Sequence, residues 1–502
     1  MQNESRRPNI LIFYPDQMRQ DAMGCAGNPV IKTPYINRLA AEGVHFTNAY
    51  VSYPVCSPFR ASLFTGKYAQ GHGMYQNHFP LNARQIFLAR LLKDAGYQTG
   101  YIGKWHLEGG PRPGFVPPGE RRFGFDHFIG FNRGHHYLKS IYYGDDGQPY
   151  HCRRFEPDYQ TDHLIEFIDA AVAEGSGKPF FGFVCYGPPH FPMNMPGYLR
   201  TLYKPEEVPL PPGILDPEQH EEARRRRLQF DCAGNVKAEL SSHAGNGHKA
   251  PGEPETEAEV RQFIAEYYGM ITNVDHNVER VLNRLDALDI AGDTLVIFLS
   301  DHGDMLGQHG YYCGIKKTAY RAAMQVPFIV RYPARFPARS EVDALIDVAV
   351  DTMPTLLELC GVPVPDAVHG ASYLPLLDGT CAETRDAVMY QSMKMHDGDV
   401  SEFTPVPERG IRTRDWLYVR QPIRRKMLFD LRNDPDELNN LAEDRGFGSL
   451  MDDFDARIQA HMEQTGDDWD LALDFPPENY LTQEEGRNYL ERELLPRAIV
   501  VP

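Results

Sequence analysis

The sequence predicts an α/β fold, with a mainly parallel sheet sandwiched by helices and a small C-terminal α+β domain. Short apolar runs alternate with segments of helical periodicity along most of the chain, a pattern typical of a parallel sheet covered on both faces. After residue 385 the pattern changes to short alternating strands and one helix. We therefore expect a large α/β domain over residues 1–385 and a C-terminal subdomain over residues 386–502.

The candidate strands of the large sheet are the apolar runs, and helices are expected between them. The runs cover residues 9–14, 97–102, 180–186, 294–300, 326–332 and 345–350. Thr33 and Pro34 begin a helix that ends at Gly43, and two further helices cover residues 85–95 and 351–360. The longest helix covers residues 257–288, because apolar residues recur there every three or four positions and form one buried stripe.

Two regions depart from this alternation. Residues 196–255 are rich in Pro, Gly and charge and are expected to form a long surface excursion, in which Arg224 to Arg227 lie on a solvated helix face. The C-terminal subdomain is expected to hold strands at 387–391, 410–413, 416–420 and 427–430 and a helix at 450–463.

Composition limits the class of function. The chain of 502 residues is 42% hydrophobic and carries a net charge of −18, with 51 basic against 69 acidic residues. A nucleic-acid binder needs a basic face, so this class is excluded, and an anionic ligand needs a locally positive pocket. The eight cysteines are scattered and are expected to be free thiols. Neither a leader nor a membrane span is visible, so the expected location is the cytoplasm.

The segment around Cys56 is the first candidate for chemistry. Ser57 is a good N-cap and Pro58 suits a first helical turn, so Cys56 is expected to lie directly before a helix. The positive end of a helix lowers the pKa of a thiol and stabilises a bound anion. This position therefore suits a nucleophile acting on an oxyanion.

Polar side chains also follow several predicted strands. Asp16 and Gln17 come directly after the first strand, and Asp301 and His302 follow the strand at 294–300. The carboxyl ends of parallel strands gather ligands at one edge of a sheet, so these donors are expected to converge on one divalent cation.

The five residues from Cys56 to Arg60 match the pattern Cys-x-Pro-x-Arg, and residues 428–441 resemble the closing segment of sulfatase C-terminal subdomains. The chain resembles the type I sulfatases of the alkaline phosphatase superfamily from residue 9 to about residue 442, in the same order of motifs. The resemblance implies a hydrolase acting on aryl, alkyl or carbohydrate sulfate esters. It also implies that a formylglycine-generating enzyme oxidises Cys56 to formylglycine.

In that family the metal ligands correspond to Asp16, Gln17, Asp301 and His302, together with the modified Cys56. The commonest family pattern is Asp-Asp and Asp-Asn, so Gln17 and His302 depart from it and resemble choline-sulfatase and the formylglycine phosphonate monoester hydrolases. Calcium is the family default. The imidazole of His302 favours manganese as an alternative, and magnesium is a further alternative.

The resemblance also assigns roles to residues at the other strand ends. Lys104, His190 and Lys316 correspond to sulfate-binding groups, with Lys317 as the alternative to Lys316. His190 corresponds to the acid that protonates the leaving alcohol, and His106 to the base that reforms the aldehyde. The remaining candidates are Arg60, which is expected to hold the formylglycine, and Asn77, which matches an active-site asparagine of the phosphonate hydrolases.

Two alternatives stay open at this stage. A formylglycine-dependent phosphonate monoester hydrolase or phosphodiesterase is favoured by Gln17 and His302, whereas the Lys104-Trp105-His106 motif favours a sulfatase. A non-catalytic sulfated-glycan-binding protein has no evident need for a modifiable cysteine beside metal donors. Self-association into a homo-oligomer is left open. The loops at 110–130 and 134–137 are expected to wall the substrate pocket with aromatic and imidazole groups.

Overall fold

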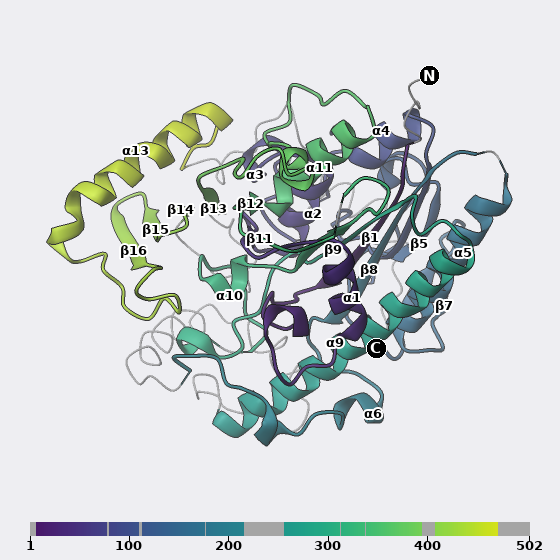
Figure 1. The fold of residues 1–502 in the computed structure, drawn as a ribbon, viewed down its shortest axis with the longest axis horizontal. Helices are drawn as coiled ribbons and strands as arrows, with labels where there is room; N and C mark the ends of the chain where they lie inside the picture. Colours follow the sequence, from purple (N-terminus) through teal and green to yellow (C-terminus); the bar gives the residue numbers. More distant parts are fainter. Residues whose placement is uncertain are drawn as a thin grey trace.

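A computed structural model describes residues 7–77, 80–109, 113–175, 177–214, 256–311, 313–336, 338–393 and 407–469. Its main element is an eight-stranded sheet with helices packed on its faces (Figure 1). The strand order is β11 (Arg339–Val342), β2 (Val44–Phe46), β10 (Phe328–Arg331), β9 (Thr294–Leu299), β1 (Asn9–Asp16), β8 (Phe180–Pro189), β4 (Gln98–Lys104) and β5 (His127–Phe131).

The centre of the sheet is parallel. β1 pairs in parallel with β8 and β9, and β4 pairs in parallel with β8 and β5. β10 runs antiparallel to both β9 and β2. The predicted α/β class with a mainly parallel sheet is therefore confirmed, and the carboxyl ends of β1, β4, β8 and β9 lie at one edge.

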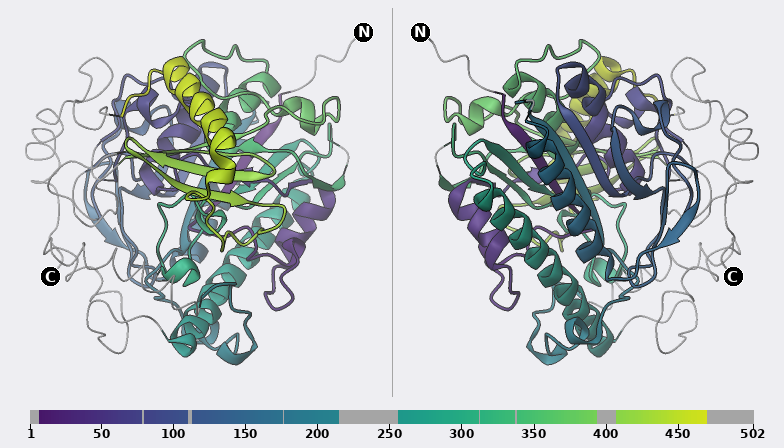
Figure 2. Two further views of the ribbon diagram at one scale, coloured as in Figure 1. Left: turned by 90° about the vertical axis from the view of Figure 1, so that its left-hand side faces the viewer. Right: turned by 90° about the vertical axis from the view of Figure 1, so that its right-hand side faces the viewer.

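Helices cover both faces of this sheet. One face carries α1 (Pro34–Glu42), α5 (Glu156–Ala173) and α9 (Glu257–Ala287), which lie side by side in Figure 2. The other face carries α2 (Cys56–Thr65), α4 (Leu88–Asp94) and α11 (Val348–Leu359). The sheet is thus enclosed between two helical layers, as the alternating sequence pattern predicts.

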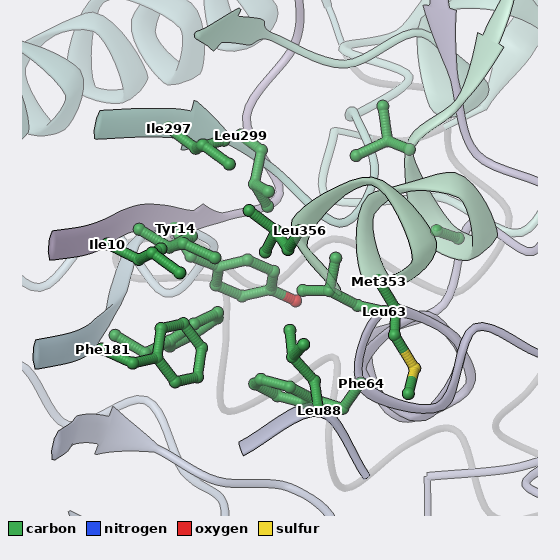
Figure 3. Close-up of a cluster of buried hydrophobic side chains, with 14 of the residues drawn as sticks. Ile10, Tyr14, Leu63, Phe64, Leu88, Phe181, Ile297, Leu299, Met353 and Leu356 are labelled. Atoms are coloured by element: carbon green, nitrogen blue, oxygen red, sulfur yellow. The ribbon is translucent and has the colours of Figure 1, made fainter. Parts of the chain in front are cut away.

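Strand β1 shows why the sheet is buried on both faces. Ile10, Ile12 and Tyr14 point into the core formed with α2, α4 and α11, shown in Figure 3. Leu11 and Phe13 point into the core formed with α1, α5 and α9. All five side chains are fully buried, and each such burial stabilises the fold by about 1.5–3 kcal/mol. This packing holds the carboxyl end of β1, where Asp16 lies, in a fixed position.

The C-terminal part forms a second, antiparallel sheet. Its order is β13 (Val388–Ser392), β14 (Glu408–Arg412), β15 (Trp416–Gln421) and β16 (Arg424–Asp430), and α13 (Gly448–Thr465) packs across it (Figures 1 and 2). The boundary that we placed after residue 385 falls shortly before β13. Gln391 N donates to Ser52 O at 2.8 Å and links this sheet to the large domain.

One predicted strand is wrong in most of its length. Within residues 345–350, only β12 (Ile346–Asp347) is strand, and it pairs with β3 (Ala49–Tyr50). Asp347 then caps α11, because its carboxylate accepts a hydrogen bond from Ala349 N at 3.1 Å. The cap begins the helix at Val348 rather than at residue 351.

Short elements complete the described fold. They are α3 (Ala69–His72), α6 (Gly197–Arg200), α10 (Arg321–Met324), α12 (Leu374–Leu377), β6 (Ile141–Tyr143) and β7 (Pro149–His151). Of the expected excursion at 196–255, residues 215–255 lie outside the described residues, and Arg224 to Arg227 are among them. In the described ranges the cysteines are free thiols, and none of the helices is both long and apolar enough to cross a membrane.

Candidate active site

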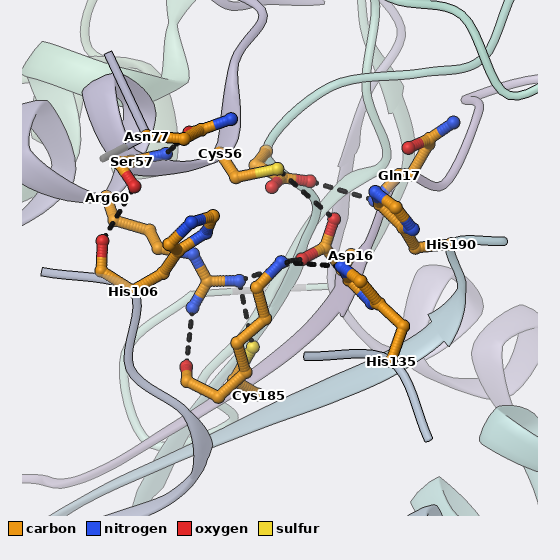
Figure 4. Close-up of polar contacts among 12 residues, drawn as sticks. Asp16, Gln17, Cys56, Ser57, Arg60, Asn77, His106, His135, Cys185 and His190 are labelled. Atoms are coloured by element: carbon orange, nitrogen blue, oxygen red, sulfur yellow. Dashed lines mark hydrogen bonds and ion pairs between the residues drawn. The ribbon is translucent and has the colours of Figure 1, made fainter. Parts of the chain in front are cut away.

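The candidate site lies where the parallel strands end at their carboxyl edge. Asp16 ends β1, Lys104 ends β4, and His190 directly follows β8. Asp301 and His302 follow β9 by two and three residues. All five side chains are buried. Asp16, Asp301 and His302 lie close to Cys56, and Lys104 contacts Asp16. Figure 4 shows Cys56 with Asp16 and His190.

The helix that carries Cys56 starts differently from the prediction. α2 begins at Cys56 itself, with Val55 as the residue before it. Ser57 is not the N-cap, because its hydroxyl donates to His106 O at 2.7 Å. Asn77 Oδ1 instead accepts from Ser57 N at 3.0 Å. Asn77 therefore satisfies a first-turn N–H of α2 and ties its own loop to the Cys56 segment.

The expected lowering of the Cys56 thiol pKa is also wrong. Burial, followed by the Asp16 carboxylate, raises the pKa of Cys56 to about 11. The positive helix end is too weak to offset removal from water and a nearby negative charge. Burial and the Asp16 charge therefore favour the protonated thiol of Cys56.

A candidate metal centre is formed by Asp16, Cys56, Asp301 and His302, whose ligand atoms all lie within 4.8 Å of one another. Cys56 Sγ is 3.3 Å from His302 Nε2 and 3.8 Å from Asp16 Oδ1. Asp301 Oδ2 is buried and accepts no hydrogen bond from the residues that the structure describes. A buried carboxylate oxygen without a donor fits a cation in this space.

The pKa of His302 supports the same fit. Burial lowers the pKa of His302 to about 4 even though Asp301 favours the charged form. Its Nδ1 faces Gly303 O at 3.0 Å, so the proton of the neutral ring lies on Nδ1 and Nε2 carries a lone pair toward the cluster. The imidazole is therefore in the form that ligates metals.

Gln17 borders this cluster but is held by other groups. Its side-chain Nε2 donates to Asp304 Oδ2 at 2.7 Å and to Gly314 O at 2.9 Å. Its Oε1 accepts from Lys316 Nζ at 2.8 Å. Its backbone N donates to Asp301 Oδ1 at 2.9 Å, so Gln17 connects the candidate metal centre to Lys316.

Asp16 is bound by two buried cations. Lys104 Nζ lies 2.7 Å and Arg60 Nη2 3.0 Å from Asp16 Oδ2. Burial disfavours the Asp16 carboxylate, but the charges of Lys104 and Arg60 outweigh it and hold the pKa of Asp16 well below its ordinary value. Arg60 contacts Asp16 here, and its expected role of holding the formylglycine stays a prediction.

Lys316 reaches the site. Lys316 Nζ lies 2.7 Å from His190 Nε2. His190 Nδ1 faces Phe191 O, so Nδ1 carries the proton and Nε2 accepts from Lys316. Burial and the Lys316 charge lower the pKa of His190 well below its ordinary value, which keeps this ring neutral.

His106 stands apart from these networks. Both of its ring nitrogens are buried and lack a hydrogen-bond partner within the described ranges. Burial, followed by the charges of Lys104 and Arg133, lowers the pKa of His106 well below its ordinary value. Figure 4 places His106 beside Arg60, on the opposite side of Cys56 from His190. A neutral imidazole in this place is available as a base.

Sequence reasoning missed His135 as a member of the site. His135 Nε2 lies 3.3 Å from Lys104 Nζ, and its ring stacks on His190 with centroids 3.7 Å apart. We expected the loop at 134–137 only to wall a pocket. The available signal was its position after an apolar run at 128–131, which is part of strand β5 at the same sheet edge.

Comparison with known families decides the class. The model of the family named Sulfatase matches residues 8–362. The chain belongs to the sulfatase family. A second model, N-sulphoglucosamine sulphohydrolase C-terminal, matches residues 307–464. This sulfatase is 31% identical to an ulvan-active sulfatase of Formosa agariphila, over 93% of the chain and 83% of the relative.

Solved structures agree with this assignment. A putative sulfatase from Bacteroides fragilis has 28% identity and a TM-score of 0.76, with 95% of this chain and 99% of that one covered. The phosphonate monoester hydrolase of Agrobacterium radiobacter has 25% identity and a TM-score of 0.74, with 91% and 96% covered. The fold is that of the alkaline phosphatase superfamily, and the protein is a hydrolase acting on sulfuric esters.

Proposed function

We propose that this sulfatase hydrolyses a carbohydrate sulfate ester with a formylglycine formed from Cys56 and one divalent cation. The observation that carries the proposal is the group of carboxylate and imidazole donors beside Cys56. Lys104 and Lys316 adjoin this group through Asp16 and His190, and His106 lies near Cys56 (Figure 4). Relatives named for carbohydrate substrates support this class, among them the N-acetylglucosamine-6-O-sulfatase of Bacteroides thetaiotaomicron, with 28% identity.

The cation would be held by Asp16, Asp301, His302 and the modified Cys56, with Gln17 beside them. Bound there, it would supply positive charge that polarises the nucleophile and the ester oxygens. The two carboxylates are hard donors that suit calcium, which stays the proposed ion. His302 Nε2 is the donor that favours manganese, and magnesium is the third candidate.

Binding of the sulfate group would fall to Lys104 and Lys316. Lys104 is fixed by Asp16 and Lys316 by Gln17 and His190, so both ammonium groups are preorganised before an ester arrives. A hydroxyl of the formylglycine hydrate would attack sulfur between them, and the bond from sulfur to the ester oxygen would break.

Two proton transfers complete the proposed cycle. His190 Nε2 accepts from Lys316 in the resting arrangement. The Lys316 ammonium would therefore supply the proton for the departing alcohol, either directly or by way of His190 Nε2. His106, with both ring nitrogens available, would take the proton of the second formylglycine hydroxyl. That transfer reforms the aldehyde and releases sulfate.

A formylglycine phosphonate monoester hydrolase is the second candidate. It is supported by the solved structure from Agrobacterium radiobacter and by Gln17, His302 and Asn77, which match that enzyme class. Matched phenyl sulfate and phenyl phosphonate esters separate the two candidates, since the proposal requires the higher kcat/KM on sulfate. A silent glycan-binding protein would turn over neither ester.

Mass spectrometry with activity tests the nucleophile. Co-expression with a formylglycine-generating enzyme should lower the mass of the Cys56 peptide by about 18 Da, and activity on 4-nitrophenyl sulfate should rise with the converted fraction. Cys56→Ala should be inactive. Cys152→Ala, a buried thiol without this sequence context, is the matched control and should keep activity. Full activity in unconverted protein would overturn the proposal.

A further inference from the structure

We propose that His135 is a positioning residue that fixes Lys104 and His190 against each other, an inference that rests on the proposed function. His135 lies in the loop after β5 and is half-buried. It contacts Lys104 through a ring nitrogen and His190 through its ring face. It therefore joins the two strand ends that supply these groups.

The hydrogen bonds fix which nitrogen of His135 carries the proton. Tyr137 Oη donates its single proton to His190 O at 2.6 Å. Tyr137 Oη lies 3.0 Å from His135 Nδ1, and with its proton already used it can only accept there. Nδ1 therefore carries the proton, and Nε2 presents a lone pair to Lys104 Nζ at 3.3 Å.

This lone pair sets the direction of the Lys104 ammonium. The group has three N–H donors, of which one goes to Asp16 Oδ2 and one to His135 Nε2. The third is left for an oxygen of the bound ester. Without His135, Asp16 is the remaining hydrogen-bond partner of Lys104 Nζ among the described residues, and the ammonium can rotate about that contact.

The ring face of His135 orients His190 in the same way. The two imidazole planes are 2° from parallel and their centroids lie 3.7 Å apart (Figure 4). His190 also stacks on Phe191, with centroids 4.4 Å apart. These ring contacts help to keep His190 Nε2 directed at Lys316. The same face of His135 thereby blocks rotation of the His190 ring.

Paired substitutions separate the acceptor from the ring. His135→Gln keeps an oxygen acceptor near the position of Nε2, whereas His135→Phe keeps a stacking ring and removes the acceptor. In the converted full-length protein with 4-nitrophenyl sulfate, we expect His135→Phe to lower kcat/KM about 10- to 100-fold, the usual effect of a lost hydrogen bond to a charged group. His135→Gln should recover most of that loss. His276→Phe and His276→Gln alter an exposed histidine of α9, away from the residues of the site, and should leave kcat/KM unchanged.

Thermal unfolding is measured for every variant, because a merely structural role would lower Tm without rescue by Gln. The wild-type protein is assayed first, and an inactive, fully converted wild type would overturn the proposed function itself. With an active wild type, unchanged kcat/KM in His135→Phe, or equal losses in the Phe and Gln variants, would overturn the role of His135. If His135→Phe does not fold, Tyr137→Phe decides. It removes the hydroxyl that fixes the tautomer and should lower kcat/KM, and no change would overturn the proposal.

Discussion

Arg60 Nη2 lies 3.0 Å from Asp16 Oδ2, and both side chains are almost completely removed from solvent. The guanidinium also donates to Lys104 O at 2.7 Å and to Cys185 Sγ at 3.1 Å, and it lies over the Tyr14 ring at 4.5 Å. Arg60 thus joins the carboxyl ends of β1 and β4 to the interior of β8. Arg60 belongs to the same sequence motif as Cys56, but in this structure its guanidinium binds Asp16.

The first prediction concerns this buried pair. Arg60→Ala should lower the free energy of unfolding by about 3–5 kcal/mol, because Asp16 and Lys104 O lose a buried charged donor. Denaturant unfolding measures it. Arg154→Ala is the control, since its ion pair with Asp162 lies at the surface and should cost no more than about 1 kcal/mol. Equal small losses in both variants would show that Arg60 does not hold the strand ends together.

The second prediction concerns the metal. Asp301→Asn removes a charged oxygen from the cluster and should lose most of the bound cation and nearly all activity. Elemental analysis gives the metal content per chain. Asp275→Asn changes a buried carboxylate that caps α1, with Ile36 N at 2.7 Å, and should keep the metal. An active wild-type preparation without any divalent ion would contradict the assignment of this cluster.

Sequence reasoning found the elements whose signals are local. The stripe from Val260 to Leu285 predicted α9 to within one residue of its observed end, and the polar pairs after β1 and β9 predicted the meeting of Asp16 with Asp301. Both predictions depend only on periodicity and on the rule that parallel strands end at one edge.

Contacts between distant segments could not be predicted in this way. Nothing near Ser57 in the sequence shows that the Ser57 backbone N would donate to Asn77. Nor does it show that the Ser57 hydroxyl would donate to His106 O. The thiol pKa went wrong for a related reason, because the Asp16 charge that raises it comes from another element. Strands as short as β12, which has two residues, cannot show the alternation of side chains by which a strand is predicted.

The third prediction concerns the proton donor. Lys316→Met removes the proton that His190 Nε2 accepts, so poor alcohol leaving groups should slow far more than 4-nitrophenyl sulfate, whose oxygen leaves without much help. His190→Ala should show the same steepened dependence on leaving-group pKa. The measurement is kcat/KM over a series of aryl and alkyl sulfates. A uniform loss across the series would assign both residues to binding alone.

The fourth prediction concerns His106. If it takes the proton that releases sulfate, His106→Ala should give a burst of alcohol near one equivalent and then stalled turnover, whatever the leaving group. Intact mass measured after the burst should show a sulfated enzyme. Gln85→Ala, another buried polar side chain, is the control and should turn over without a burst. Slow turnover with no burst would remove His106 from the release step.

The last prediction concerns Glu156, at the start of α5 behind the loop of His135. Burial raises the pKa of Glu156 from its ordinary 4.5 to about 7, although Ser140 Oγ and Gln160 Nε2 donate to the carboxylate. A folded-state pKa above the unfolded one means that the folded protein binds the extra proton. Its contribution to stability is therefore complete below about pH 4.5 and is lost as the pH rises through about 7.

Glu156→Gln stays uncharged over this range, so the free energy of unfolding of the wild type should fall relative to that of the variant by on the order of 3 kcal/mol between about pH 4 and about pH 8. Denaturant unfolding at a series of pH values measures the difference. Glu166→Gln, on the exposed side of the same helix, should track the wild type at every pH. Because Glu156 N donates to Tyr137 O at 2.8 Å, ionisation of this carboxyl should also loosen the loop that carries His135. Parallel pH profiles for the wild type and Glu156→Gln would show that the carboxyl ionises at the same pH in the folded and unfolded chain.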